Sequence, residues 1–212
     1  RKYAEDGTML WGKSLPITAI GNYFELAPDQ QGGAAIGLYV GRTPLVAQPD
    51  SVLHYFKFLT VNAVGDIILA KKIKRDIFVD SPAGKEFIHF QGFSFQSLNP
   101  AGFLVTCNYT TGAYSTVDLF RLTENLEFEW AKSVGELISS GVPATPTLIF
   151  SYAGIITKPF GNGNVLFIKN ASLLPEAILC TELDQNGEVV WTKQLEYTNS
   201  GSPLYNISAT ID

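Results

Sequence analysis

The fold is decided by one stretch near the carboxyl end, which reads Asn186-Gly187-Glu188-Val189-Val190-Trp191-Thr192-Lys193-Gln194-Leu195. A clear second copy lies near the amino end and reads Asp6-Gly7-Thr8-Met9-Leu10-Trp11-Gly12-Lys13-Ser14-Leu15. Two weaker copies, residues 64–73 and 125–134, lie between them. Because one pattern recurs four times along 212 residues, the chain is predicted to be a repeat protein.

Each copy carries a large apolar residue at the same position, which we call the anchor. The anchors are Trp11, Leu69, Trp130 and Trp191, spaced 58, 61 and 61 residues apart. A lysine follows each anchor by two residues, at Lys13, Lys71, Lys132 and Lys193. In a strand, residues two apart point to the same face. We therefore expect each lysine stem to cover the anchor ring while its ammonium reaches solvent.

Each repeat is predicted to contain four antiparallel strands, because its apolar runs are short, rich in β-branched and aromatic residues, and mostly bounded by Gly, Asn or Ser. The expected first strands are 87–95 and 147–156, the second are 35–40, 103–107 and 165–168, the third are 53–59, 116–122 and 177–183, and the fourth carries the anchor. Tandem four-stranded units of about 60 residues are typical of all-β propellers, in which radial packing hides most sheet edges. An anchor tryptophan can fill the wedge between neighbouring sheets, and Leu69 does so less completely.

The third and fourth strands are predicted to be joined by a tight turn. Asp184-Gln185-Asn186-Gly187 is a hairpin signal, because Asn-Gly supplies the positive φ angles that primed two-residue turns require. Asp6-Gly7 gives the same signal in the first copy.

Residues 182–195 resemble a known repeat. The stretch Leu183-Asp184-Gln185-Asn186-Gly187, followed by Trp191 and Lys193, is similar to the LD-x-NG-x-x-x-W-x-K repeat of bacterial secreted β-propellers. That repeat is frequent in exported and cell-surface proteins of Bacteroidota, and the likeness extends more loosely to the tryptophan-docking repeat of quinoprotein propellers. The resemblance covers nearly the whole chain as a repeat. It implies a propeller fold and an exported location, whether periplasmic, cell-surface or extracellular.

The phase of the repeat predicts one propeller domain or segment over residues 1–212. It divides into a partial blade 1–18, blades 19–75, 76–136 and 137–197, and a partial blade 198–212. Two architectures fit this division: a four-bladed ring in which the last strand joins residues 9–15 in a shared blade, or a portion of a larger propeller. We favour the second, because a repeat protein that stops within a unit exposes an unpaired edge.

Composition excludes several classes of protein. With 46% hydrophobic and 17% charged residues, the chain can bury a substantial core and is not expected to be disordered. A net charge of −5 argues against a nucleic-acid or anionic-membrane surface, and we interpret the basic residues at 71–75 as a solvated strand end. No apolar stretch approaches the roughly 20 residues that cross a bilayer. Cys107 and Cys180 fall on different strands of different units, so we expect two buried free thiols.

No set of residues predicts catalysis, a metal site or a cofactor. His54 and His89 have no partner at metal-ligand spacing and no Gly-x-Ser-x-Gly motif beside them, so we interpret both as surface or strand-end residues. Asp184, Asn186 and Glu188 alternate as calcium ligands can, but a hairpin explains the same residues and the other copies lack equivalent oxygens.

The connections between second and third strands differ between units, at about residues 41–52, 108–115 and 170–176. Variable loops on a rigid scaffold are the usual place for binding. Tyrosine and arginine are enriched where partners dock. The candidate partner contacts are therefore Tyr39, Arg42, Tyr109 and Tyr114.

Together these observations predict a non-enzymatic binding or scaffolding module of an exported bacterial protein. Its expected partner is a protein or a glycan, or another chain that completes the propeller. One alternative is a propeller-class enzyme, namely a hydrolase, a lyase or a quinoprotein-like oxidoreductase with a site in the central channel. Two carboxylates converging in that channel would favour the enzyme. The other alternative is a purely structural segment of a longer repeat protein.

Overall fold

A computed structural model describes residues 1–14, 23–29, 32–44, 51–78, 89–98, 101–111, 114–137, 156–160, 162–170 and 177–196. Over these ranges the chain is all-β, as predicted. Its strands are β1 (Lys2–Tyr3), β2 (Met9–Trp11), β3 (Phe24–Pro28), β4 (Ala34–Pro44), β5 (Ser51–Val61), β6 (Ile67–Phe78), β7 (His89–Ser97), β8 (Phe103–Thr111), β9 (Tyr114–Leu122), β10 (Phe128–Leu137), β11 (Ile156–Pro159), β12 (Val165–Asn170), β13 (Ala177–Leu183) and β14 (Val189–Glu196). This part of the chain contains no helix long and apolar enough to span a membrane.

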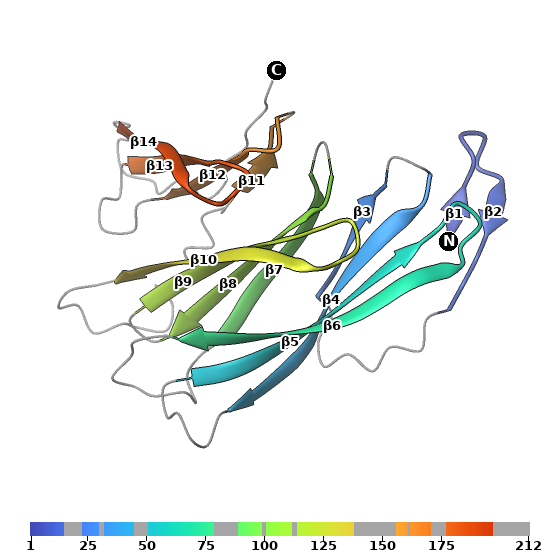
Figure 1. Ribbon diagram of the computed structural model, residues 1–212, viewed down its shortest axis with the longest axis horizontal. Coiled ribbons are helices and arrows are strands. Elements are labelled where there is room, and N and C mark those ends of the chain that lie inside the picture. Colours follow the sequence, from blue (N-terminus) through green and yellow to red (C-terminus); the bar gives the residue numbers. More distant parts are fainter. Residues whose placement is uncertain are drawn as a thin grey trace.

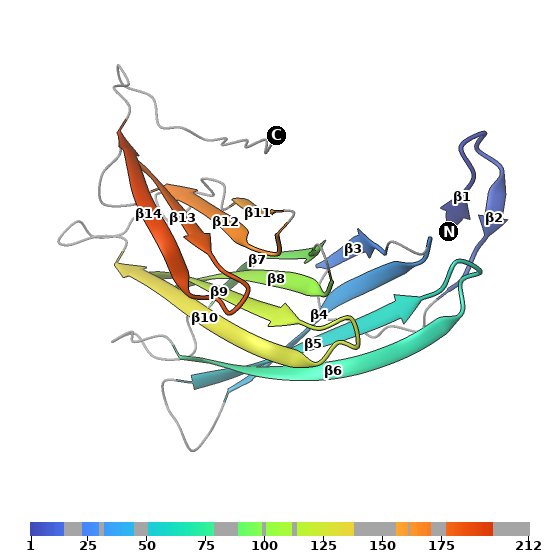
Figure 2. The ribbon, with the colours of Figure 1, turned by 45° about the horizontal axis from the view of Figure 1, so that its top comes forward.

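The strands form three four-stranded antiparallel sheets and one two-stranded sheet. Each four-stranded sheet is a meander, with spatial orders β3-β4-β5-β6, β7-β8-β9-β10 and β11-β12-β13-β14, and β1 pairs with β2. The sheets follow one another along a curve in the order of the sequence (Figures 1 and 2). The first strands β3 and β7 contact each other, and the fourth strands β6, β10 and β14 lie on the outer side of the curve (Figure 2).

The expected strands match the observed ones best at the third position, where 177–183 is β13 itself. One predicted strand is described only at its end, and the ends of the second strands need correction. The first strand predicted at 147–156 overlaps the observed β11 only at Ile156, and residues 147–155 lie outside the described part of the chain. The second strands continue past their predicted ends, to Pro44 in β4 and to Thr111 in β8. Residues that we placed in loops are therefore parts of strands.

The turn between β13 and β14 is not the primed turn that the Asn-Gly signal predicts. Gly187 has a φ of 77°, but Asn186 does not have a positive φ. The amide of Gly187 donates to the carbonyl of Asp184 at 3.0 Å, and the amide of Asp184 donates to the carbonyl of Glu188 at 2.8 Å. This geometry fits a type I turn followed by a left-handed residue and a bulge. A separate register shift follows within the strands, between Glu182 and Leu183.

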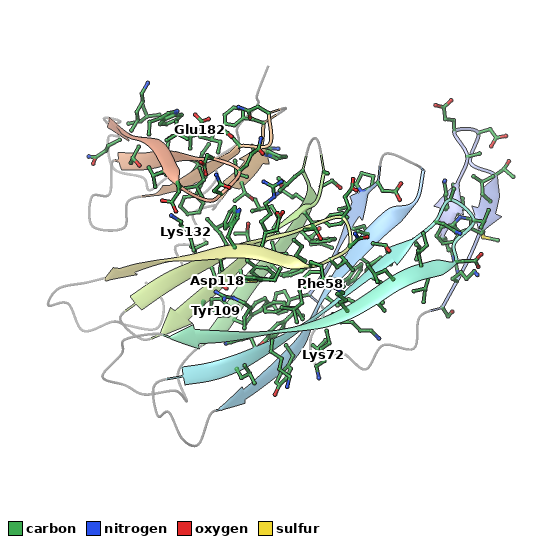
Figure 3. The ribbon with its side chains drawn as sticks, viewed as in Figure 1. Phe58, Lys72, Tyr109, Asp118, Lys132 and Glu182 are labelled. Carbon is green, nitrogen blue, oxygen red and sulfur yellow. The ribbon has the colours of Figure 1, made fainter. Side chains whose placement is uncertain are left out.

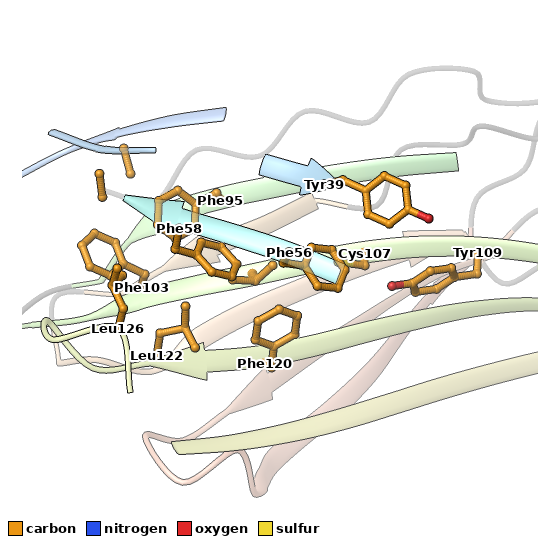
Figure 4. Close-up of a cluster of buried hydrophobic side chains, with 13 residues drawn as sticks. Tyr39, Phe56, Phe58, Phe95, Phe103, Cys107, Tyr109, Phe120, Leu122 and Leu126 are labelled. Carbon is orange, nitrogen blue, oxygen red and sulfur yellow. The ribbon is translucent and has the colours of Figure 1, made fainter. Parts of the chain in front are cut away.

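The main core lies between the first two four-stranded sheets. Its buried side chains come from β3, β4 and β5 on one side and from β7, β8, β9 and the turn after β9 on the other (Figure 4). Aromatic rings meet across the junction, with centroids 5.6 Å apart for Phe56 and Phe120 and 5.3 Å apart for Phe58 and Phe95. At about 25 cal/mol per Å² of apolar surface, these rings are a main source of cohesion between the sheets.

The sheet of β7, β8, β9 and β10 is buried on both faces. Along β9, Phe120 and Leu122 belong to the core toward β3–β6, while Val117 and Leu119 belong to a cluster with Phe167 of the next sheet. Successive residues of a strand point to opposite faces. The apolar residues at both odd and even positions of this strand are thus explained by burial on both sides.

Candidate functional site

Neighbouring sheets are joined by a contact that repeats along the chain, which we call the clasp. In the first junction, the indole N–H of Trp11 donates to the carbonyl of Ala63 at 2.8 Å. The ring lies over Gly65, where an added Cβ would come within 2.7 Å of it. Gly65 has a φ of 85°, so both its conformation and its space require the absence of a side chain.

The same contact joins the second and third four-stranded sheets. The indole N–H of Trp130 donates to the carbonyl of Gln185 at 2.7 Å, and a Cβ on Gly187 would come within 2.8 Å of the ring. Arg121 donates to the same carbonyl at 2.9 Å. One carbonyl of the turn therefore accepts hydrogen bonds from two side chains of the preceding sheet.

The middle junction replaces both partners of this contact. Its anchor is Leu69, and the residue equivalent to the two glycines is Leu126. Leu126 is buried, and Leu69 packs against the cluster that contains it. Leu126 is the only non-glycine residue with a positive φ in the described chain, at 57°. A leucine side chain thus occupies the space that an indole ring occupies in the other two junctions.

The lysines that follow the anchors reach the next sheet. Lys13 pairs with Asp66 at 2.7 Å, Lys132 pairs with Glu188 at 3.1 Å, and Lys71 pairs with Glu127. The ammonium groups therefore have carboxylate partners, in addition to the solvent contact that we expected. Exposed pairs of this kind contribute at most about 1 kcal/mol each. Their main effect is to select the turn of the next sheet that each anchor contacts.

The clasps give the row of sheets a common direction. Each clasp places a fourth strand against the third-to-fourth turn of the next sheet, so these turns lie at the same end of every sheet. Because neighbouring strands are antiparallel, the opposite end carries the last residues of the second strands, Pro44, Thr111 and Asn170, and the first residues of the third strands. We call this end the connection edge.

A buried polar cluster lies between the first two four-stranded sheets near the connection edge. The hydroxyl of Tyr39 is 3.1 Å from Nδ1 of His54, and both side chains are buried. The ring of Tyr39 stacks on Phe90 with centroids 3.8 Å apart, and the ring of His54 meets Tyr109 edge-on at 4.6 Å. Aromatic stacking and a hydrogen bond together hold these polar groups inside the core.

An ion pair completes the cluster. Arg75 of β6 donates to both carboxylate oxygens of Asp118 on β9, at 3.0 Å from Nε and 2.8 Å from Nη2. Asp118 is fully buried (Figure 3), and the guanidinium lies 5.6 Å from the ring centre of Phe128. A buried carboxylate needs such a partner, because desolvation of an unpaired charge costs several kcal/mol. The pair thus ties the two sheets together in one arrangement.

The Cys107 thiol and the Tyr109 hydroxyl interact with this cluster, and both are held in their protonated forms. Burial, followed by the negative charge of Asp118, raises the pKa of the Cys107 thiol well above its usual value. Burial also raises the pKa of the Tyr109 hydroxyl, with a further contribution from Cys107. A thiol acts as a nucleophile in its thiolate form. Burial therefore keeps the Cys107 thiol in its non-nucleophilic form.

Two of the four candidate contact residues are not on the surface. Tyr39 and Tyr109 are buried in the core, because β4 and β8 continue through them and turn their rings toward the neighbouring sheet. The backbone of Arg42 lies in β4 and that of Tyr114 in β9, next to the connection edge, and their side chains lie outside the described part.

The expectation for His54 is also wrong, since the ring is fully buried; the side chain of His89 lies outside the described part. Sequence reasoning missed the ion pair of Arg75 and Asp118, whose partners lie 43 residues apart. Apolar neighbours on both sides of Asp118 signalled its burial.

Asp184, Asn186 and Glu188, which alternate as calcium ligands can, take part in the hydrogen bonds of the turn. Oδ1 of Asp184 accepts hydrogen bonds from the amides of Asn186 and Glu188, both at 2.8 Å. These bonds, that of Glu188 first, lower the pKa of Asp184. Among the described residues, no group of three His, Cys, Asp or Glu side chains is placed to hold a metal. The two cysteines are unpaired as expected, with Cys107 buried and Cys180 only partly so.

Comparison with known proteins gives no family for this chain. No protein-family model matches it, and no curated protein matches its sequence.

Proposed function

We propose that the sheets are the blades of a β-propeller, either a four-bladed ring or a portion of a larger one. Three observations support this. The sheets are four-stranded meanders, their first strands lie on the inner side of a curve, and equivalent clasps join each sheet to the next. Radial packing of this kind is how propellers cover their sheet faces.

We further propose that the chain is a binding or scaffolding module of an exported bacterial protein. The observation that carries this proposal is the common direction of the sheets, which gathers the second-to-third connections at one edge. Three clasps at the opposite end and the ion pair of Arg75 and Asp118 join the sheets that carry this edge. Variable connections on a rigid base suit the recognition of a protein or a glycan. The resemblance of residues 182–195 to repeats of exported propellers supports the location.

The binding proposal is favoured over a propeller-class enzyme by the state of the buried titratable groups. Cys107 and Tyr109 are protonated and enclosed between sheets, and Asp118 is paired with Arg75. Buried groups that are protonated or paired favour one packing arrangement of a scaffold. An active site instead needs groups that are free to react.

The test is a binding screen with variants at the two ends of the sheets. The chain would be screened against a printed glycan array and a displayed peptide library, together with Arg42→Ala and Tyr114→Ala, which flank the connection edge. Val64→Ala is the matched control, because Val64 is exposed on a turn at the opposite end. We expect both edge variants to weaken binding to the selected ligand at least tenfold and the control to bind as the wild type does. Equal binding by all variants would contradict the proposal, and so would a loss confined to Val64→Ala.

A further inference from the structure

Each clasp has a donor half and an acceptor half. The donor half is an anchor with its lysine, on a fourth strand, and the acceptor half is the third-to-fourth turn of the next sheet. The three junctions use the donors at residues 11, 69 and 130 and the acceptor turns at 62–66, 123–127 and 184–188. One donor half, Trp191 with Lys193 on β14, and one acceptor half, the turn at residues 4–8, remain outside these junctions.

The unused acceptor half has the right shape and is open. Gly7 has a φ of 84°, close to the 85° of Gly65 and the 77° of Gly187. A Cβ built on Gly7 meets nothing within 4 Å, whereas on the other two glycines it meets an indole ring. The turn also closes with the same hydrogen bond, from the amide of Gly7 to the carbonyl of Ala4 at 3.0 Å.

β1, the strand that leads into this turn, has an exposed residue at a position that is buried in the three equivalent strands β5, β9 and β13. Tyr3 is 52% exposed. The equivalent residues Val61, Leu122 and Leu183 are 4%, 0% and 4% exposed, and the last two pack against the preceding sheet. Tyr3 thus marks a face that is covered at every other junction.

The unused donor half shows the complementary difference. Leu195 on β14 is 53% exposed, whereas its equivalent Ile73 on β6 packs against the main core. The indole N–H of Trp191 donates to Glu182 of its own hairpin, and the Lys193 ammonium lies 5.4 Å from the centre of the Trp191 ring. The donor half is therefore folded back on its own sheet, with its apolar neighbour uncovered.

The two halves are also complementary in charge. Glu5 and Asp6 immediately precede Gly7, and both are exposed. Lys193 would approach this acidic turn if Trp191 covered Gly7, as Lys13 approaches Asp66 in the first junction. The residue at the position of Asp66 is Thr8, so the charge comes from within the turn instead of from the residue after it.

We propose that the two halves meet between two copies of this chain, with the Trp191 ring of one copy lying over Gly7 of the other. The two-stranded sheet and the sheet of β14 stand at opposite ends of the row (Figure 2), so the contact joins one copy to the next. Such a head-to-tail contact closes into a ring or continues as a filament. The docking uses neither Arg42 nor Tyr114, so it stands apart from the proposed ligand site.

The test uses two variants that each disable one half. Trp191→Ala removes the donor ring. Gly7→Asn keeps a residue that tolerates positive φ while placing a Cβ where the ring would lie. Val190→Ala is the matched control, because Val190 is exposed and is the residue next to Trp191 in β14. Mass would be measured by light scattering over a range of concentrations, with circular dichroism to confirm that each variant is folded.

The wild type and Val190→Ala are expected to show masses of two or more chains that fall on dilution. Each disabled variant is expected to have the mass of one chain, and an equimolar mixture of the two is expected to form a species of two chains, since the mixture retains one intact donor and one intact acceptor. A wild type that stays at the mass of one chain would overturn the proposal. So would a mixture that stays at that mass, which would indicate closure within a chain, and so would association that survives in either variant alone.

Discussion

The middle clasp offers the sharpest test of how the sheets are joined. It has leucine at both positions where the other junctions have tryptophan and glycine, at Leu69 and Leu126. If these positions exchange volume across the junction, replacing both should restore an indole ring over a glycine. The double variant Leu69→Trp, Leu126→Gly is predicted to be more stable than the two single variants imply.

The magnitudes follow from burial and backbone conformation. Leu69→Trp alone overpacks a filled junction, at a cost of about 1–3 kcal/mol. Leu126→Gly alone removes a buried side chain, at about 2–5 kcal/mol, partly offset by about 1–2 kcal/mol because glycine adopts the left-handed conformation without strain. In the double variant the indole fills the cavity and its N–H faces the carbonyl of Glu124, which corresponds to the two carbonyls that accept in the other clasps. A favourable coupling of about 2 kcal/mol is expected.

The measurement is a double-mutant cycle from urea unfolding followed by far-UV circular dichroism, which the added tryptophan perturbs little. The matched control replaces Ile68 instead of Leu69, since Ile68 is exposed and is the residue next to Leu69 in β6. Ile68→Trp is expected to show no coupling to Leu126→Gly. Additive effects of Leu69→Trp and Leu126→Gly, within about 0.5 kcal/mol, would refute the proposed exchange of volume.

Three further predictions concern the ion pair, the turns and the thiols. Asp118→Asn leaves Arg75 without its carboxylate and should destabilise the fold by about 3–5 kcal/mol, measured by urea unfolding; a loss below 1 kcal/mol would mean that the pair is dispensable. Hydrogen bonds lower the pKa of Asp184 in the folded chain, so its contribution to stability is present above the usual Asp pKa of about 3.9 and is lost as the pH falls toward the folded value. Asp184→Asn, which can accept the same amide bonds, should therefore narrow the difference in Tm between pH 7 and pH 3, and an unchanged difference would contradict this origin. Cys180 should react with a thiol reagent in the native chain, whereas Cys107 should react only after unfolding; rapid native labelling of both would show that the core is open.

The sequence predicted those features that depend on local pattern. The recurrence of an anchor every 58 to 61 residues predicted four-stranded units, and the apolar run 177–183 predicted β13 with both ends correct. The face shared by an anchor and the lysine two residues later also follows from strand geometry alone. In the structure these two side chains reach the same neighbouring turn, as Trp130 and Lys132 do.

Features that depend on packing between sheets were harder to predict. Tyr109 was placed in a loop because a polar residue, Asn108, precedes it. It continues the alternation of Phe103, Val105 and Cys107, however, and this alternation was the signal that it faces the core. Charged residues on strands are usually solvated. The apolar neighbours of Asp118 indicated its burial, but its partner Arg75 could not be predicted without the arrangement of the sheets.

The type of turn between β13 and β14 was predicted wrongly for a different reason. Asn-Gly is the strongest signal for a primed two-residue turn, yet residues 184–188 form a longer turn in which only Gly187 has a positive φ. The carboxylate of Asp184, by accepting two amides, stabilises this alternative. Sequence signals name the residue that needs a positive φ more reliably than they name the type of turn.

The central claim is that anchor rings dock on glycine turns of the next sheet, and proton NMR tests it most directly. In a nuclear Overhauser spectrum, we predict cross-peaks from the indole ring protons of Trp11 to the Hα protons of Gly65, and from those of Trp130 to Gly187, with the glycine Hα resonances shifted upfield by the rings. Absence of both sets of cross-peaks, with glycine Hα shifts at their unstructured values, would contradict the account.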